Sequence, residues 1–130
     1  MAKILIVDDS MMMRRNLRKI LTEAGHEVVG EAENGSEACA AFGEHKPDLV
    51  TMDINMPVMD GIEAVKRILI DFPEANIVMI SAHNEQNRVY QAIKCGARNY
   101  IVKPVRYDKV VTVVNQVLDQ AAKPAESAES

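Results

Sequence analysis

Lys3–Ser10 reads KILIVDDS, a run of four apolar residues followed at once by two aspartates and a serine. A short apolar run with polar ends is typical of a strand buried on both faces of a parallel sheet. Two adjacent carboxylates repel each other and resist burial in an apolar core. We therefore predict that Ile4–Val7 is a strand covered on both faces, and that Asp8 and Asp9 are not buried but point into a polar site.

Further short apolar runs recur about every 20 to 25 residues along the chain. Between them lie segments in which apolar residues keep the spacing of an amphipathic helix. Strand and helix thus alternate five times, which predicts an α/β fold. The predicted strands after the first are Val28–Val29 with its flanks, Leu49–Met52, Ile77–Ile80 and Tyr100–Val102.

The predicted helices have recognisable ends. Ser10 is a candidate N-cap and Gly25 a stop for the first, while Pro73 follows the third and Gly96 the fourth. The last segment, KVVTVVNQVL at 109–118, is rich in valine, but its helical period and its length favour a helix over a strand. The apolar residues that define the five predicted helices are, in chain order, Met13, Leu17, Ile20, Leu21 and Ala24; Ala38, Ala41 and Phe42; Ile62, Val65, Ile68, Leu69 and Phe72; Val89, Ala92 and Ile93; and Val110, Val111, Val114, Val117 and Leu118.

This alternation indicates a doubly wound (βα)5 domain, with a five-stranded parallel sheet covered by helices on both faces. The 130 residues suffice for one such domain, which we assign to residues 1–121. The remaining residues, AKPAESAES at 122–130, are small, polar or charged apart from a proline. They cannot form a buried face, so we expect a disordered tail.

Composition and charge exclude several classes of function. The net charge of −4 argues against a general affinity for nucleic acid. No apolar run approaches the roughly 20 residues of a membrane helix, and no signal peptide opens the chain, so we expect a cytoplasmic protein. Cys39 and Cys95 form no C-x-x-C pair, and the three histidines have no zinc-type spacing.

The ends of the predicted strands carry most of the candidate site. In open α/β sheets, ligands bind beyond the carboxyl ends of the strands. Three carboxylates, a hydroxyl and an ammonium are therefore expected to share one rim. Strand one ends in Asp8 and Asp9, strand three in Asp53, strand four in Ser81, and strand five in Lys103, which precedes a proline.

Carboxylates at such close range repel one another by about 4 kcal/mol per pair at an intermediate dielectric. A hard divalent cation relieves this repulsion, and Mg²⁺ takes carboxylate oxygens together with a substrate phosphate. A nearby lysine and serine suit phosphoryl transfer to a carboxylate. We predict that Asp53 is the nucleophile, because the adjacent pair Asp8 and Asp9 is better arranged to hold metal.

The motifs at these strand ends resemble those of response-regulator receiver domains. They are VDDS at 7–10, MDINMPVMDG at 52–61, SA at 81–82 and KP at 103–104. Each is common by itself, but the ordered set on five βα units is specific. The resemblance extends to about Leu118, and it is greatest to the single-domain chemotaxis members of that family.

The resemblance implies a flavodoxin-like strand order 2-1-3-4-5 and a role for each matching residue. Asp53 would accept a phosphoryl group from a histidine kinase. Asp9 would bind Mg²⁺ directly and Asp8 largely through water, with the backbone carbonyl of Asn55 as a further ligand.

The resemblance also implies roles for residues around the phosphoacceptor. Ser81 would contact the phosphoryl group in the active state, Lys103 would pair with a phosphoryl oxygen, and Tyr100 matches the aromatic residue that turns inward on activation. Val105 replaces an aromatic that is common in the family, which leaves the partner surface there open. His83 is either an exposed loop histidine or an influence on phosphate lifetime.

By resemblance, then, the chain is expected to be a two-component signalling switch in chemotaxis or a phosphorelay. It would catalyse the transfer of a phosphoryl group to itself and the slow loss of that group, but its role would be signalling rather than enzymatic turnover. Its output target would be a protein bound by the face of helix four, strand five and helix five. No DNA binding or membrane insertion is expected, and the chain would be a monomer or weak dimer.

The sequence argues against two other functions. A phosphohydrolase with an aspartyl nucleophile generally needs an acid two residues after the nucleophile, where this chain has Asn55, and a cap domain that 130 residues cannot hold. A nucleotide or flavin binder needs glycines or hydroxyls after strand one, where DDSMMM offers anions instead.

Overall fold

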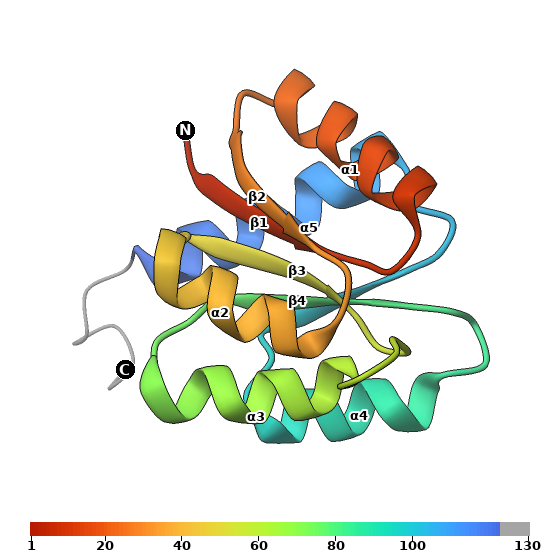
Figure 1. The fold of residues 1–130 in the computed structure, drawn as a ribbon. Coiled ribbons are helices and arrows are strands. Elements are labelled where there is room, and N and C mark those ends of the chain that lie inside the picture. The colour runs from red at the N-terminus through yellow and green to blue at the C-terminus, as the bar shows by residue number, and fades with distance from the viewer. Residues whose placement is uncertain (123–130) are drawn as a thin grey trace, which may run out of the picture.

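Five strands alternate with five helices in the computed structural model, which describes residues 1–122 (Figure 1). The alternation predicted from the sequence is confirmed, including a helix for the valine-rich last segment. The tail expected at 122–130 lies outside the described residues, apart from Ala122. The elements are β1 Lys3–Val7, α1 Met11–Glu23, β2 Glu27–Ala32, α2 Gly35–His45, β3 Leu49–Asp53, α3 Gly61–Asp71, β4 Ile77–Ser81, α4 Gln86–Cys95, β5 Asn99–Val102 and α5 Tyr107–Ala121.

The strands form one parallel sheet in the order β2-β1-β3-β4-β5, as the resemblance implied. Helices α1 and α5 cover one face, and α2, α3 and α4 cover the other (Figure 1). The order places β1 and β3 side by side at the centre, with β4 next to β3. The carboxyl ends of these central strands therefore lie next to one another, where the candidate site was predicted.

Each face of the sheet has its own hydrophobic core. Leu5 and Val7 face the core under α2, α3 and α4, whereas Ile4 and Ile6 face the core under α1 and α5. Burial of a large aliphatic side chain contributes about 1.5 to 3 kcal/mol, so these two cores hold the sheet rigid. The fourth predicted helix is confirmed as α4; of its three apolar residues, Val89 and Ala92 are buried against the sheet, whereas Ile93 is exposed.

The helices start where the sequence supplies a cap. Ser10 Oγ accepts a hydrogen bond from the Met13 amide at 3.2 Å, which confirms the predicted N-cap of α1. Asp60 caps α3 in the same way, through the Glu63 amide at 2.9 Å. A Cβ at the next residue, Gly61, would collide with the Asp53 backbone carbonyl. Glycine there lets α3 begin directly against the end of β3.

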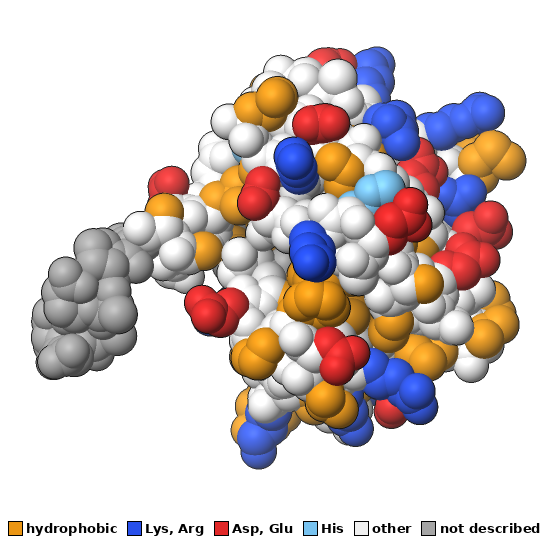
Figure 2. Space-filling view, turned by 60° about the vertical axis from the view of Figure 1, so that its left-hand side comes forward, with side chains coloured by type: hydrophobic (Ala, Val, Ile, Leu, Met, Phe, Trp, Pro, Cys, Tyr) orange, Lys and Arg blue, Asp and Glu red, His pale blue; other side chains and the backbone are white. Residues whose placement is uncertain are grey.

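The distribution of charged side chains on the surface agrees with the modest net charge. Acidic and basic side chains are interspersed over the face shown in Figure 2, so this face lacks the continuous basic surface typical of nucleic acid binding. Among residues 1–122, no helix is both long and apolar enough to span a lipid bilayer.

Candidate functional site

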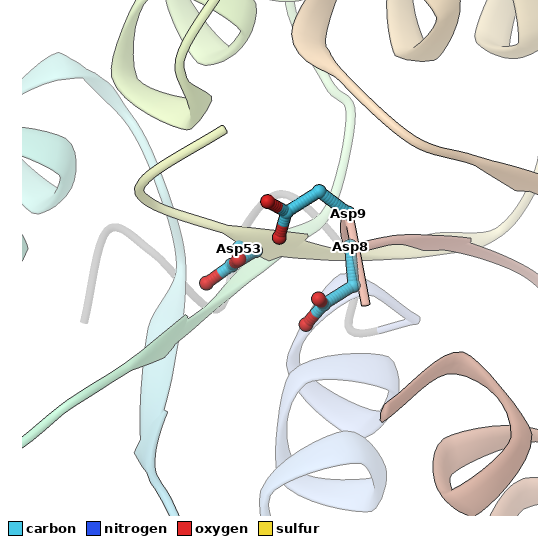
Figure 3. A group of neighbouring side chains, drawn as sticks. All are labelled: Asp8, Asp9 and Asp53. Carbon is cyan, nitrogen blue, oxygen red and sulfur yellow. The ribbon is translucent and has the colours of Figure 1, made fainter. Parts of the chain in front are cut away.

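Three aspartates converge at the carboxyl ends of the two central strands. Asp8 and Asp9 directly follow β1, and Asp53 is the last residue of β3. Each offers a carboxylate oxygen, and these oxygens all lie within 4.8 Å of one another (Figure 3). The structure thus brings together the three carboxylates that the sequence placed on one rim.

The expectation that the adjacent pair is not buried was wrong for Asp8. Asp8 is fully buried and Asp53 is 4% exposed, whereas Asp9 is exposed. Asp8 directly follows β1, which is covered on both faces, whereas the chain bends at Asp9 and leaves the sheet. The site is therefore a partly buried acidic pocket rather than an open acidic surface.

Local backbone contacts hold the Asp8 carboxylate in place. Its Oδ1 accepts a hydrogen bond from the Ser10 amide at 2.9 Å, and Arg14 Nη1 donates to the Asp8 backbone carbonyl at 2.7 Å. Asp8 Oδ2 has no hydrogen-bond partner within residues 1–122, and Lys103 Nζ lies 4.0 Å away from it. Burial raises the pKa of Asp8, and the neighbouring Asp9 charge adds to this, against the Ser10 amide and the Lys103 ammonium.

Asp53 has two donors at one oxygen. Its Oδ1 accepts hydrogen bonds from the Ile54 amide at 3.0 Å and from Lys103 Nζ at 3.3 Å. Burial raises the pKa of Asp53 to about 6, with a further contribution from the Asp8 charge and an opposing one from Lys103. The carboxylate is thus ionised at neutral pH in spite of its burial, and it is an available nucleophile.

The hydroxyl of Ser81 lies at the end of the next strand. Ser81 is the last residue of β4, and one residue earlier Ile80 pairs with Asp53 in the sheet. The side chain is buried, and Ser81 Oγ has no hydrogen-bond partner in the part of the chain that is described. An unpartnered buried hydroxyl costs about 1 to 3 kcal/mol, so this group is available to a ligand at the site.

Side-chain contacts that the sequence did not predict tie together the loops beyond β3 and β4: Glu85 and Arg88 were not expected in the site, and Asn55 was expected there only through its backbone carbonyl. The Asn55 side-chain amide donates to Glu85 Oε2, and Glu85 Oε1 accepts from the Ala82 amide at 2.7 Å. Arg88 Nη2 donates to Asp60 Oδ2 at 2.9 Å. The sequence signal for these contacts was weak: Ala82 and Glu85 have the three-residue spacing of a capping box, but alanine is not a capping residue and Glu85 itself precedes the helix.

Tyr100 lies on the surface beside a groove. The residue is 44% exposed, and a cavity of about 380 Å³ lies between α4 and β5. Ser81 lines one end of this cavity, with Val89 and Tyr90 along the helix. The groove thus connects the region of Tyr100 to a hydroxyl of the acidic site. His83, which also lines the groove, is exposed.

Chemically, the site combines oxygen ligands for a hard cation with donors for an anion. The carboxylates of Asp8, Asp9 and Asp53 have the oxygen chemistry that Mg²⁺ prefers. Lys103 and Ser81 are the donors, and Asp53 lies between the two sets. This arrangement suits the covalent capture of a phosphoryl group on a carboxylate.

Comparison with known proteins gives consistent matches. A family model described as response regulator receiver domain matches residues 4–115. The chain is 50% identical to the chemotaxis protein CheY of Thermotoga maritima over 115 residues, which is 88% of this chain and 96% of that protein. It is also 50% identical to CheY of Bacillus subtilis over 117 residues, 90% of this chain and 98% of that one.

A solved structure shows the same fold. The chain is similar to a chain in the crystal structure of the CheX-CheY-BeF3-Mg complex from Borrelia burgdorferi, with a TM-score of 0.85 and 37% identity. The match covers 88% of this chain and 87% of that one.

Proposed function

The chain belongs to the response regulator receiver domain family and is a phosphorylation-dependent switch of two-component signalling; we propose that Asp53 is its phosphoacceptor. The observation that carries this assignment is the environment of Asp53. It is a buried carboxylate that contacts the Lys103 ammonium, lies next to the acidic pair, and has a pKa raised to about 6.

Asp8, Asp9, Asp53 and the backbone carbonyl of Asn55 would hold Mg²⁺ at this site. Asp8 Oδ2, buried without a hydrogen-bond partner within residues 1–122, supports a cation here, because such an oxygen is costly unless a positive charge satisfies it. When bound, the ion neutralises charge on the incoming phosphoryl group.

The residues of this chain supply the remaining chemistry. An oxygen of the Asp53 carboxylate attacks phosphorus, and the bond from phosphorus to the histidine nitrogen of the donor breaks, so that an acyl phosphate forms. Lys103 Nζ, 3.3 Å from Asp53 Oδ1, would bind a phosphoryl oxygen. The free hydroxyl of Ser81 would donate to another. Slow loss of the phosphoryl group to water would return the switch to its resting state.

The partners proposed for this switch are proteins. The donor would be a histidine kinase, and the output target would bind the face formed by α4, β5 and α5, in chemotaxis. Tyr100 belongs to this face, and the groove beside it extends to Ser81. Movement of Ser81 toward a phosphoryl group would therefore change the space available to the Tyr100 ring.

Beryllofluoride, which mimics a phosphoryl group on a carboxylate, tests this function. We expect that beryllofluoride and Mg²⁺ shift the amide resonances of the wild type at Asp53, at Ser81 and as far as Tyr100. The Asp53→Asn variant, which lacks the nucleophile, serves as control and should show no such shifts. Shifts confined to the three aspartates, with none at Tyr100, would refute the proposed switch.

A further inference from the structure

Glu85 joins the two loops that flank Asp53. It is the last residue before α4 and is half-buried. One of its carboxylate oxygens accepts from the Ala82 amide, in the β4–α4 loop, at 2.7 Å. The other accepts from the side-chain amide of Asn55, in the β3–α3 loop. A single carboxylate therefore takes one donor from each loop.

Both donors lie beside the phosphoacceptor in the sequence and in the sheet. Asn55 is two residues after Asp53, and Ala82 directly follows Ser81. The pairing of Asp53 with Ile80 places the first residues of the two loops next to each other at the end of the sheet. Donors at this place suit an anion, and in this structure the anion they bind is Glu85.

The same region anchors α4. Arg88, one turn further along the helix, donates to Asp60 Oδ2 at 2.9 Å and to Asn55 Oδ1 at 3.5 Å. Glu85 and Arg88 thus hold the start of α4 against the β3–α3 loop. Displacement of the Glu85 carboxylate would remove its contact with Asn55, while the contact between Arg88 and Asp60 would remain.

We propose that Glu85 is a positioning residue that competes with the phosphoryl group on Asp53 for these donors, and so limits how readily the switch is activated. The inference rests on the proposed function. A phosphoryl group adds about 1.5 to 2 negative charges, which repel a nearby carboxylate and attract its donors. Activation therefore has to displace Glu85, which frees the Ala82 amide and loosens the start of α4.

A purely structural role for Glu85 predicts the opposite effect. If Glu85 only closes the turn from Ala82 to α4 through its contact with the Ala82 amide, its removal would disorder the loop. Binding of a phosphoryl mimic would then weaken or stay unchanged. If Glu85 competes for the donors, its removal strengthens binding, even where the fold loses some stability.

The test compares the wild type with Glu85→Gln, Glu85→Ala and the control Glu74→Gln, an exposed glutamate before β4. The dissociation constant of beryllofluoride is measured by amide shifts at saturating Mg²⁺. We expect Glu85→Ala to bind about tenfold more tightly, as loss of one charge-assisted competitor implies. Glu85→Gln should lie between it and the wild type, because an amide still accepts but carries no charge. Glu74→Gln should match the wild type.

Two further measurements separate the possible failures. Thermal melts of each variant establish that it is folded, and the Ala82 amide resonance of the free proteins should shift in both Glu85 variants but not in Glu74→Gln. Equal or weaker beryllofluoride binding by folded Glu85→Ala overturns the role of Glu85 alone. A wild type that binds no beryllofluoride overturns the proposed function, and this inference with it.

Discussion

At the amino-terminal ends of the strands, the side chains of His26, Asp48 and Asn76 each bind a backbone group. At the carboxyl-terminal ends, Asp8 and Ser81 are instead buried with part of their hydrogen-bonding capacity unused. At the amino end, Asp48 Oδ2 accepts from the Lys3 amide at 2.7 Å, and Asn76 Nδ2 donates to the Asp48 carbonyl at 3.0 Å. His26 Nδ1 accepts from the Ala2 amide at 3.2 Å. These contacts close the ends of strands and need no ligand.

At the carboxyl end, the unused capacity is concentrated around one point. Two of the three unpartnered buried side-chain atoms in the described part of the chain, Asp8 Oδ2 and Ser81 Oγ, lie here, and Asp53 keeps a raised pKa beside them. The third, Thr51 Oγ1, lies in the middle of β3. A depression of about 500 Å³ lies at the amino end, larger than the groove beside Tyr100, but the side chains of His26, Asp48 and Asn76 in its lining already bind backbone groups. Unsatisfied buried polar groups thus identify the functional end better than the size of a hollow does.

The largest effect on stability is expected at the carboxyl end. Without metal, Asp53→Asn should raise the free energy of unfolding at pH 7.5 by up to about 3 kcal/mol, because a pKa raised from its ordinary value near 4 to about 6 means that the folded state disfavours the charge. The measurement is denaturant unfolding of both proteins in a chelating buffer. A variant less stable than the wild type would contradict the view that charge is disfavoured at the carboxyl end of the sheet.

The difference in the free energy of unfolding between Asp53→Asn and the wild type should depend on pH. The folded wild type binds more protons than the unfolded chain between about pH 4 and pH 6, so its stability falls as the pH rises through that window. The gain from Asp53→Asn should therefore be fully present above about pH 6 and vanish below about pH 4, where Asp53 is protonated in both states.

A smaller effect of opposite sign is expected at the amino end. Asp48→Ala removes the acceptor for the Lys3 amide at an exposed position, so the free energy of unfolding should fall by less than about 1 kcal/mol. Beryllofluoride binding should not change, because Asp48 lies at the other end of the sheet. A loss of binding in Asp48→Ala would show that the two ends are coupled.

Much of the fold could be predicted because its signals are local. Apolar runs define β1, β3 and β4, and Ser10 marks the start of α1 through a contact within its own turn. The strand ends then placed Asp53 and Ser81 in the site, because parallel strands bring their carboxyl ends to the same edge. The strand order came from the resemblance, since contacts between strands leave no local pattern.

What could not be predicted depends on contacts between distant residues. The burial of Asp8 depends on distant parts of the chain that surround it, among them Lys103, and two adjacent aspartates do not reveal it. Glu85 and Asn55 are 30 positions apart and meet only in the folded chain. The exposure of Ile93 follows from how α4 is oriented on the sheet, which its apolar spacing left open.

Phosphoryl labelling with acetyl phosphate tests the central claim that the carboxyl end of the sheet is a phosphoacceptor site with Asp53 as its nucleophile. With Mg²⁺, intact-mass spectrometry should find one added phosphoryl group on the wild type and on Asp48→Ala, and none on Asp53→Asn. A chelator should abolish the labelling of all three proteins. Equal labelling of the wild type and Asp53→Asn would contradict the account.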